Sequence, residues 1–163
     1  MSTPDQSLAD EYKTGKEYAL RRLGKRECSS QDLRRKIIDK GISAETSALI
    51  VEELARKSLV SDERFARMLI RQQATKSKGA RFISQKLKEQ GIDLSNQVIS
   101  EIASEVTACS EVETARNFVE RKYPGFKEDK KTAARASQAL QRRGFSFDVI
   151  AKALRDSAPE ASY

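Results

Sequence analysis

The same helix-ending pattern occurs three times in this chain of 163 residues. The stretches KIIDKGIS (36–43), KLKEQGID (86–93) and ALQRRGFS (139–146) each lead into a glycine from a run with apolar or small residues four apart. A spacing of four places such residues on one helical face. Glycine adopts without strain the left-handed conformation in which many helices end. The sequence therefore predicts three helices that stop at Gly41, Gly91 and Gly144.

An apolar residue and then a helix-starting residue follow each of these glycines. In a helix ended by glycine, the next residue packs onto the last helical turn. The expected pairs are Ile42 with Ile37, Ile92 with Leu87, and Phe145 with Leu140. Ser43, Asp93 and Ser146 come next and are residue types that cap helix N-termini. Each junction is therefore expected to end one helix and begin another.

Helical patterns also precede each middle segment, and no segment shows the alternation of a strand. Ser29 and Ser30 are expected to open the middle helix of the first unit, and Ser61 to cap the helix that follows residue 61. The predicted fold is all-α: a tandem array of three three-helix repeats, elongated and able to curve, because such small units bury their cores by stacking. The predicted parts are a flexible segment at 1–15, repeats at 16–60, 61–110 and 111–156, and a flexible tail at 157–163. A compact nine-helix globule is the structural alternative.

The sequence lacks the residues that are typical of several classes of enzyme and metal-binding protein. The chain has no histidine, no Walker-type phosphate loop and no serine-hydrolase motif. Its carboxylate pairs are adjacent in sequence and would point in different directions on a helix. We therefore expect no enzyme activity, no cofactor and no metal. Cys28 and Cys109 are expected to be unpaired thiols of a reducing compartment.

No apolar run is long enough to span a membrane, and the N-terminus lacks the regions of a secretory signal. The chain is therefore expected to be cytoplasmic and to have no membrane partner.

The formal net charge of +7 is unevenly distributed. Basic residues outnumber acidic ones in each middle-helix window (29–41, 76–91 and 127–144) but in none of the third-helix windows. Stacked repeats would align the middle helices into a basic stripe that attracts phosphate backbones. The candidate contact residues are Arg34, Arg35, Lys36, Lys76, Lys78, Arg81, Lys86, Lys88, Lys130, Lys131, Arg135, Arg142 and Arg143. The plain alternative is that these side chains only solvate exposed helix faces.

A set of motif residues carries a family resemblance. The set is Leu33-Arg34-Arg35-Lys36, Ser61-Asp62-Glu63-Arg64-Phe65-Ala66, then Gly79, Arg81, Ile83, Leu87 and Gly91-Ile92, with Gly41 and Gly144 at the matching joints. With these residues the chain resembles the RecX regulatory proteins over nearly its whole length. Most motif residues are expected to be structural, with Phe65 in the core. Ser61, Lys78 and Phe82 depart from the family pattern.

The resemblance implies a regulator that binds RecA and the RecA–DNA filament. It implies modulation, mostly inhibition, of recombinase, ATPase and co-protease activity in DNA repair, recombination and the SOS response. The site would lie in the filament groove or at its growing end. Partners would be RecA and single- or double-stranded DNA, bound without sequence readout by a monomer.

Two other functions remain open at this stage. A general DNA-binding module is one, although basic residues recur in all three repeats instead of on one recognition helix. A protein–protein scaffold with no nucleic-acid role is the other.

Overall fold

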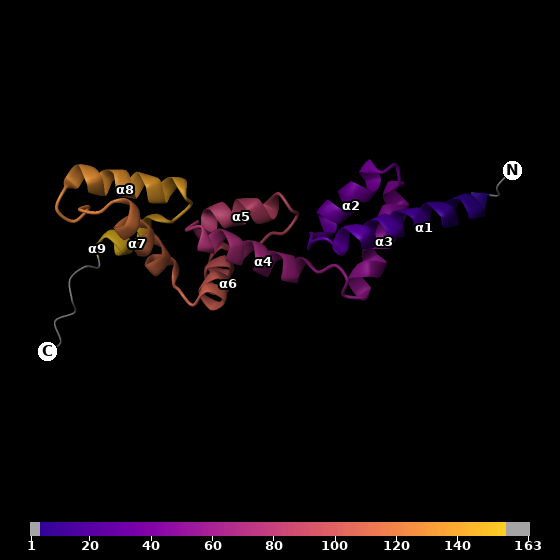
Figure 1. Ribbon diagram of the computed structural model, residues 1–163, viewed down its shortest axis with the longest axis horizontal. Helices are drawn as coiled ribbons and strands as arrows, with labels where there is room; N and C mark the ends of the chain where they lie inside the picture. Colours follow the sequence, from indigo (N-terminus) through magenta and orange to yellow (C-terminus); the bar gives the residue numbers. More distant parts are fainter. Residues whose placement is uncertain (1–3, 156–163) are drawn as a thin grey trace. The chain divides into compact units, whose positions relative to one another are not determined.

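All regular secondary structure in the described part of the chain is helical. The computed structural model describes residues 4–155, and that range contains nine helices and no strand (Figure 1). The helices are α1 (Pro4–Leu23), α2 (Ser30–Asp39), α3 (Ala44–Arg56), α4 (Asp62–Thr75), α5 (Ala80–Lys88), α6 (Asn96–Thr107), α7 (Glu111–Lys122), α8 (Lys130–Arg142) and α9 (Phe147–Arg155). The predicted all-α repeat class is confirmed. The expected tail at 157–163 lies outside the described residues.

The first helix begins at Pro4, so the prediction of a flexible segment at 1–15 is wrong for the described residues of that segment. Contacts with α3 and the residue before it hold this early part of α1. The carboxylate of Glu11 accepts hydrogen bonds from the backbone N–H of Ser43 and from the hydroxyl of Thr46. Lys16 Nζ lies 2.7 Å from Glu53 Oε1. Polar contacts hold this early part of α1, and the sequence before residue 12 has no apolar periodicity. The sequence pattern therefore did not reveal this part of the helix.

Serine caps begin four helices as predicted. Ser29, Ser43, Ser61 and Ser146 each accept, at 3.1–3.3 Å, a hydrogen bond from the backbone N–H three residues later. The prediction that Asp93 caps the next helix is wrong. The Asp93 carboxylate lies 3.6 Å from Lys88 Nζ, and Ser95 caps α6 instead. The hydroxyl of Ser95 supplies an alternative acceptor, so the helix starts later than predicted.

The three junction glycines have the backbone conformation that the sequence predicts. Their φ angles are +89° at Gly41, +76° at Gly91 and +86° at Gly144. In the third junction the backbone N–H of Phe145 donates to the carbonyl of Leu140 at 3.2 Å, as expected for a helix ended by a left-handed residue. The glycine-ended helix is therefore a confirmed feature of the fold.

The chain forms two compact units. Unit 1 holds the residues up to Ala66 together with Gln90–Ile92, and unit 2 holds Arg67–Glu89 and the residues from Asp93 onward. The first turn of α4 thus belongs to unit 1, whereas the sequence places a repeat boundary before residue 61.

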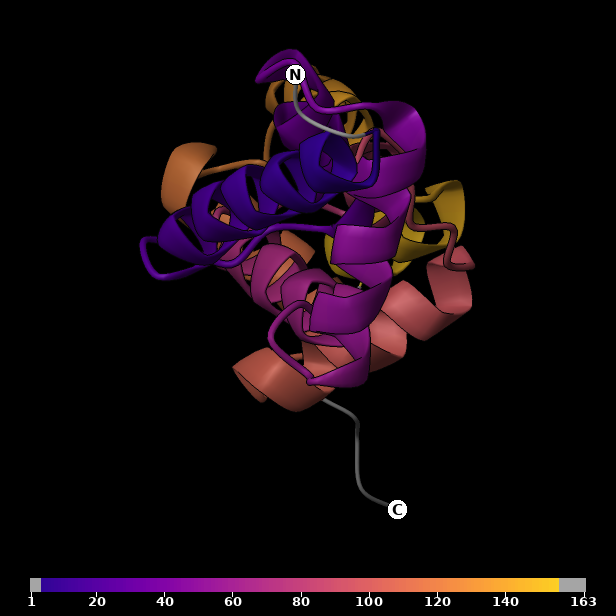
Figure 2. The same cartoon turned by 90° about the vertical axis from the view of Figure 1, so that its right-hand side faces the viewer.

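Each unit has its own apolar core. In unit 1, α1 and α2 both pack on α3, and Figure 2 shows the indigo α1 crossing the purple α3. Leu33, Ile37, Ile50 and Leu54 are completely buried there. In unit 2, α5 packs on α6, and α7 and α8 pack on α9. Phe65 is buried as predicted.

Candidate functional site

In unit 2, the end of α8 abuts the start of α5. The backbone N–H of Gly79 donates to the carbonyl of Arg143 at 2.8 Å, and that of Arg81 donates to the carbonyl of Gly144 at 3.2 Å. The two helices follow one another along the upper side of unit 2 in Figure 1. Free carbonyls at one helix end thus satisfy free N–H groups at the start of another, with their dipoles aligned favourably.

Two glycines make this close approach possible. A Cβ atom on Gly79 would lie 2.5 Å from the carbonyl carbon and oxygen of Gly144. A Cβ atom on Gly144 would lie 2.6 Å from Cβ of Phe82. The sequence predicts Gly144 as a helix terminator, but its role in contact with α5 follows only from the tertiary structure.

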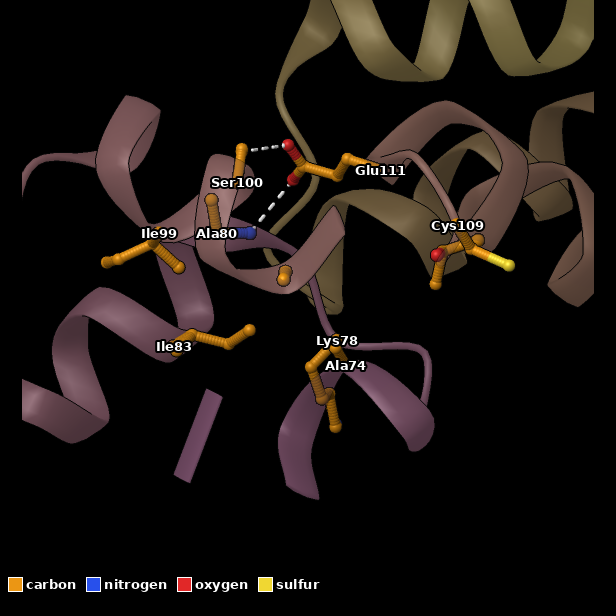
Figure 3. A pocket seen from close by; sticks show the side chains of 10 residues that line it. Ala74, Lys78, Ala80, Ile83, Ile99, Ser100, Cys109 and Glu111 are labelled. Carbon is orange, nitrogen blue, oxygen red and sulfur yellow. Dashed lines mark hydrogen bonds between the residues drawn. The ribbon is translucent and has the colours of Figure 1, made fainter. Parts of the chain in front are cut away.

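Glu111 fixes the start of α5 from a second side. One carboxylate oxygen accepts from the backbone N–H of Ala80 at 2.9 Å, and the other accepts from the hydroxyl of Ser100 at 2.6 Å (Figure 3). Ile83 and Ile99 are buried beside this contact. A carboxylate from the first residue of α7 therefore caps α5, which has no side-chain cap of its own.

The same arrangement recurs in unit 1 at the start of α2. The carboxylate of Asp62 accepts from the backbone N–H of Ser30 at 2.7 Å, as Glu111 does for α5. The turn that contains Gly91 lies against α2, because the Ser29 hydroxyl is 3.4 Å from the side-chain oxygen of Gln90. A Cβ atom on Gly91 would collide with the side chain of Gln31. The motif residue Asp62 therefore stabilises a helix other than its own.

Arg64 also stabilises the fold rather than facing a partner freely. Its guanidinium forms an ion pair with Glu27 and donates to the carbonyls of Ser58 at 3.2 Å and Leu59 at 3.4 Å. Sequence reasoning placed Arg64 in the motif without finding these partners, since all of them lie outside its own helix.

Six of the candidate contact residues in unit 2 are exposed and form no ion pair or side-chain hydrogen bond with the residues that the structure describes. We call them the basic row: Lys76, Arg81, Lys130, Lys131, Arg135 and Arg142. Within α8, Lys131, Arg135 and Arg142 are four and seven residues apart and share one helical face. Because α8 and α5 meet end to end, the joint fixes the basic residues of the two helices relative to one another.

Two candidate contact residues of unit 2 are packed instead. The Arg143 guanidinium lies 4.1 Å from the ring centroid of Phe118 and donates to the carbonyl of Lys76 at 2.8 Å. Lys78 Nζ lies 4.4 Å from the ring centroid of Phe82. Burial, and then the charges of Arg143 and Lys76, lower the pKa of Lys78. Arg143 and Lys78 therefore serve the joint between α8 and α5.

The remaining candidate residues have local partners. On α5, Lys86 and Lys88 form ion pairs with Glu89 and Asp93 at 2.9 and 3.6 Å. On α2, Arg35 and Lys36 pair with acidic residues three positions away at 2.5 and 3.9 Å. Arg34 is exposed and its guanidinium reaches the carbonyl of Ala44 at 3.4 Å. A continuous stripe through all three repeats stays a prediction.

Both cysteines are free. Cys28 is buried in the core of unit 1, and this burial raises the pKa of its thiol. Its packing is that of a small apolar residue. In residues 4–155, no helix is both long enough and apolar enough to cross a bilayer.

Comparisons with known proteins agree on one family. Residues 61–96 match the model of the second three-helix domain of RecX, and residues 110–154 match that of the third. A regulatory protein RecX from Trichlorobacter lovleyi is 35% identical over 139 residues, covering 81% of this chain and 88% of the relative. Another from Halorhodospira halophila is 31% identical, covering 81% of each chain.

A solved structure shows the same fold. The crystal structure of RecX from Lactobacillus salivarius matches with a TM-score of 0.74 and 22% sequence identity. The match covers 90% of this chain and 96% of that structure.

Proposed function

Because this chain belongs to the RecX family of regulatory proteins, we propose that it binds RecA and the RecA–DNA filament and modulates, mostly by inhibition, the activities of that recombinase. The contacts are electrostatic and do not read base sequence, since exposed cations without fixed partners attract phosphate groups and acidic surfaces alike. The DNA-binding surface includes the basic row of unit 2.

The observation that carries this proposal is that the cations of the basic row are exposed and form no ion pair with the described residues. Cations that already pair with acidic neighbours gain less from a new anionic partner, because the existing ion pair must be broken first. Lys131, Arg135 and Arg142 have no such pair within the described residues, and the joint at Gly79 and Gly144 fixes their helix against α5. Lys86 and Lys88 are the weaker candidates, because both are paired.

Charge reversal in the basic row tests the proposal. The variant carries Lys131→Glu and Arg135→Glu, and the matched control carries Lys152→Glu and Arg155→Glu on α9 of the same unit. Both variants change the net charge equally, so only the position of the change differs. Circular dichroism verifies that both variants keep their helical content.

We expect the α8 variant to bind RecA filaments on single-stranded DNA at least about tenfold more weakly, with a salt dependence whose slope falls by about one for each lost phosphate contact. Inhibition of RecA-dependent ATP hydrolysis should weaken in parallel, whereas the α9 control should resemble the original chain. Equal binding by the two variants would remove the basic row from the interface. If the original chain leaves ATP hydrolysis unchanged over a wide concentration range, the regulatory role itself is wrong.

A further inference from the structure

A second group of cations surrounds an open hollow in unit 1. The hollow is lined by Tyr18, Arg21, Arg22, Lys25 and Lys40. None of these residues belongs to the basic row or to the contact residues that the sequence predicts. The space measures about 260 Å³, whereas about 10–15 Å³ of such space is enough to hold one water molecule. The hollow therefore has room for a group much larger than water.

The helical repeat brings the first four of these side chains together. Tyr18, Arg21, Arg22 and Lys25 lie three, four and seven residues apart, which places them on one side of α1 and of the turn that continues it. Lys40, the C-cap residue between α2 and Gly41, approaches from the other side. Its Nζ atom lies 5.4 Å from the ring centroid of Tyr18. Two helix ends thus form the two walls.

Arg22 forms a fixed wall of the hollow. Its guanidinium lies 3.3 Å from Asp32, and its side chain is 20% exposed. The Nε atom of Arg22 is buried and has no hydrogen-bond partner among the described residues. By contrast, Arg21, Lys25 and Lys40 are exposed and form no ion pair within the described range. Three exposed donors therefore surround one anchored guanidinium.

Local structure alone does not account for this concentration of charge. Basic residues near a helix C-terminus offset a partial charge of about half an electron. Two helix C-termini and the Asp32 carboxylate together supply about two negative charges, and Arg35 also contacts that carboxylate. The four cations around the hollow therefore exceed this negative charge. Such an excess favours an anion, and guanidinium and ammonium groups together suit the several oxygens of a phosphate group.

We propose that this hollow binds a phosphate group that carries two or more negative charges, as a terminal phosphate or a phosphate chain does. Three free cations and one anchored guanidinium match such a group better than the single charge of a backbone phosphodiester. The chemistry is shared by a free pyrophosphate or nucleoside triphosphate and by the 5′-phosphate at a DNA end. The site is independent of the proposed basic row, so either can fail without the other.

Titration of the full, ¹⁵N-labelled chain with inorganic pyrophosphate tests the site by NMR. The pocket variant carries Arg21→Gln and Lys25→Gln. The matched control carries Lys13→Gln and Arg56→Gln, two exposed cations of the same unit outside the hollow. All four positions are exposed, so folding should be unaffected. We expect pyrophosphate to change the amide chemical shifts of residues 18–25 and 40 only. The affinity for pyrophosphate should be at least about tenfold lower in the pocket variant and unchanged in the control.

Two oligonucleotides that differ only in a 5′-phosphate or a 5′-hydroxyl distinguish the sources. A preference for the 5′-phosphate that disappears in the pocket variant identifies a DNA end as the ligand. Equal binding of the two strands, together with pocket-dependent pyrophosphate binding, identifies a free phosphate compound. The proposal is overturned if pyrophosphate causes no shifts at the hollow up to millimolar concentration, or if both variants bind it equally.

Discussion

Replacing Gly79 by alanine isolates the contact between α8 and α5. Its φ of −82° suits alanine as well as glycine. In an open position this change would stabilise the chain by about 0.4–1 kcal/mol, because alanine restricts the unfolded state. Here the new Cβ would lie 2.5 Å from the carbonyl group of Gly144 and the backbone nitrogen of Phe145. These are backbone atoms, so no side-chain rotation relieves the overlap.

The cost follows from the bonds that must lengthen. The turn after α8 has to move away from Gly79, which weakens the 2.8 Å bond to the carbonyl of Arg143 and the 3.2 Å bond from Arg81 to Gly144. Each such hydrogen bond contributes about 0.5–1.5 kcal/mol, and forced overpacking adds about 1–3 kcal/mol. We therefore expect Gly79→Ala to destabilise unit 2 by roughly 1–5 kcal/mol, opposite in sign to the usual effect.

Urea unfolding and NMR amide exchange measure this change. The backbone amide of Arg81 should exchange faster in Gly79→Ala, because its acceptor is Gly144. Gly24→Ala is the control, since its Cβ would meet its nearest atom, the carbonyl oxygen of Leu20, at an ordinary 3.5 Å. The control should be neutral or slightly stabilised. Full stability and unchanged protection of the Arg81 amide in Gly79→Ala would refute the close approach.

Two further predictions concern carboxylates of unit 1. Hydrogen bonds from Lys16 and Lys57, with a smaller contribution from Tyr12, lower the pKa of Glu53 to about 2. Because the pKa is lower in the folded state, this stabilisation is complete above about pH 4.5 and is lost as the pH falls towards 2. The free energy of unfolding in urea should therefore differ less between pH 6 and pH 3 for Glu53→Gln than for the original chain. Asp62→Ala leaves the N–H of Ser30 without its acceptor and should cost about 1–2 kcal/mol in thermal unfolding, whereas an unchanged midpoint would contradict the capping role.

Local interactions explain why much of the fold could be predicted. The serine caps at Ser29, Ser43 and Ser146 bond to N–H groups three residues away. Phe145, which follows the glycine that ends α8, donates its backbone N–H to the carbonyl of Leu140 in the preceding turn. Both ends of each interaction lie within one short window of sequence. Spacing and residue type were therefore sufficient to predict them.

The candidate site was harder to predict, because exposure and pairing depend on distant residues. All the basic residues could be found in the sequence, but nothing there separates the free Arg142 from its neighbour Arg143. The guanidinium of Arg143 is held by Phe118 and by the backbone of Lys76, both far away along the chain. The hollow lined by Lys40 was missed for the same reason, since Lys40 joins α1 only in the folded unit.

The sequence by itself determined the helices apart from the starts of α1 and α6, together with their glycine ends and the concentration of positive charge in the middle segments, since each depends on neighbours within a few turns. Only the tertiary structure decided that Asp62 and Glu111 cap helices other than their own and that Gly79 and Gly144 bring α5 and α8 end to end. These contacts join residues more than thirty positions apart. Their partners are set by how the helices pack, and no local pattern records that packing.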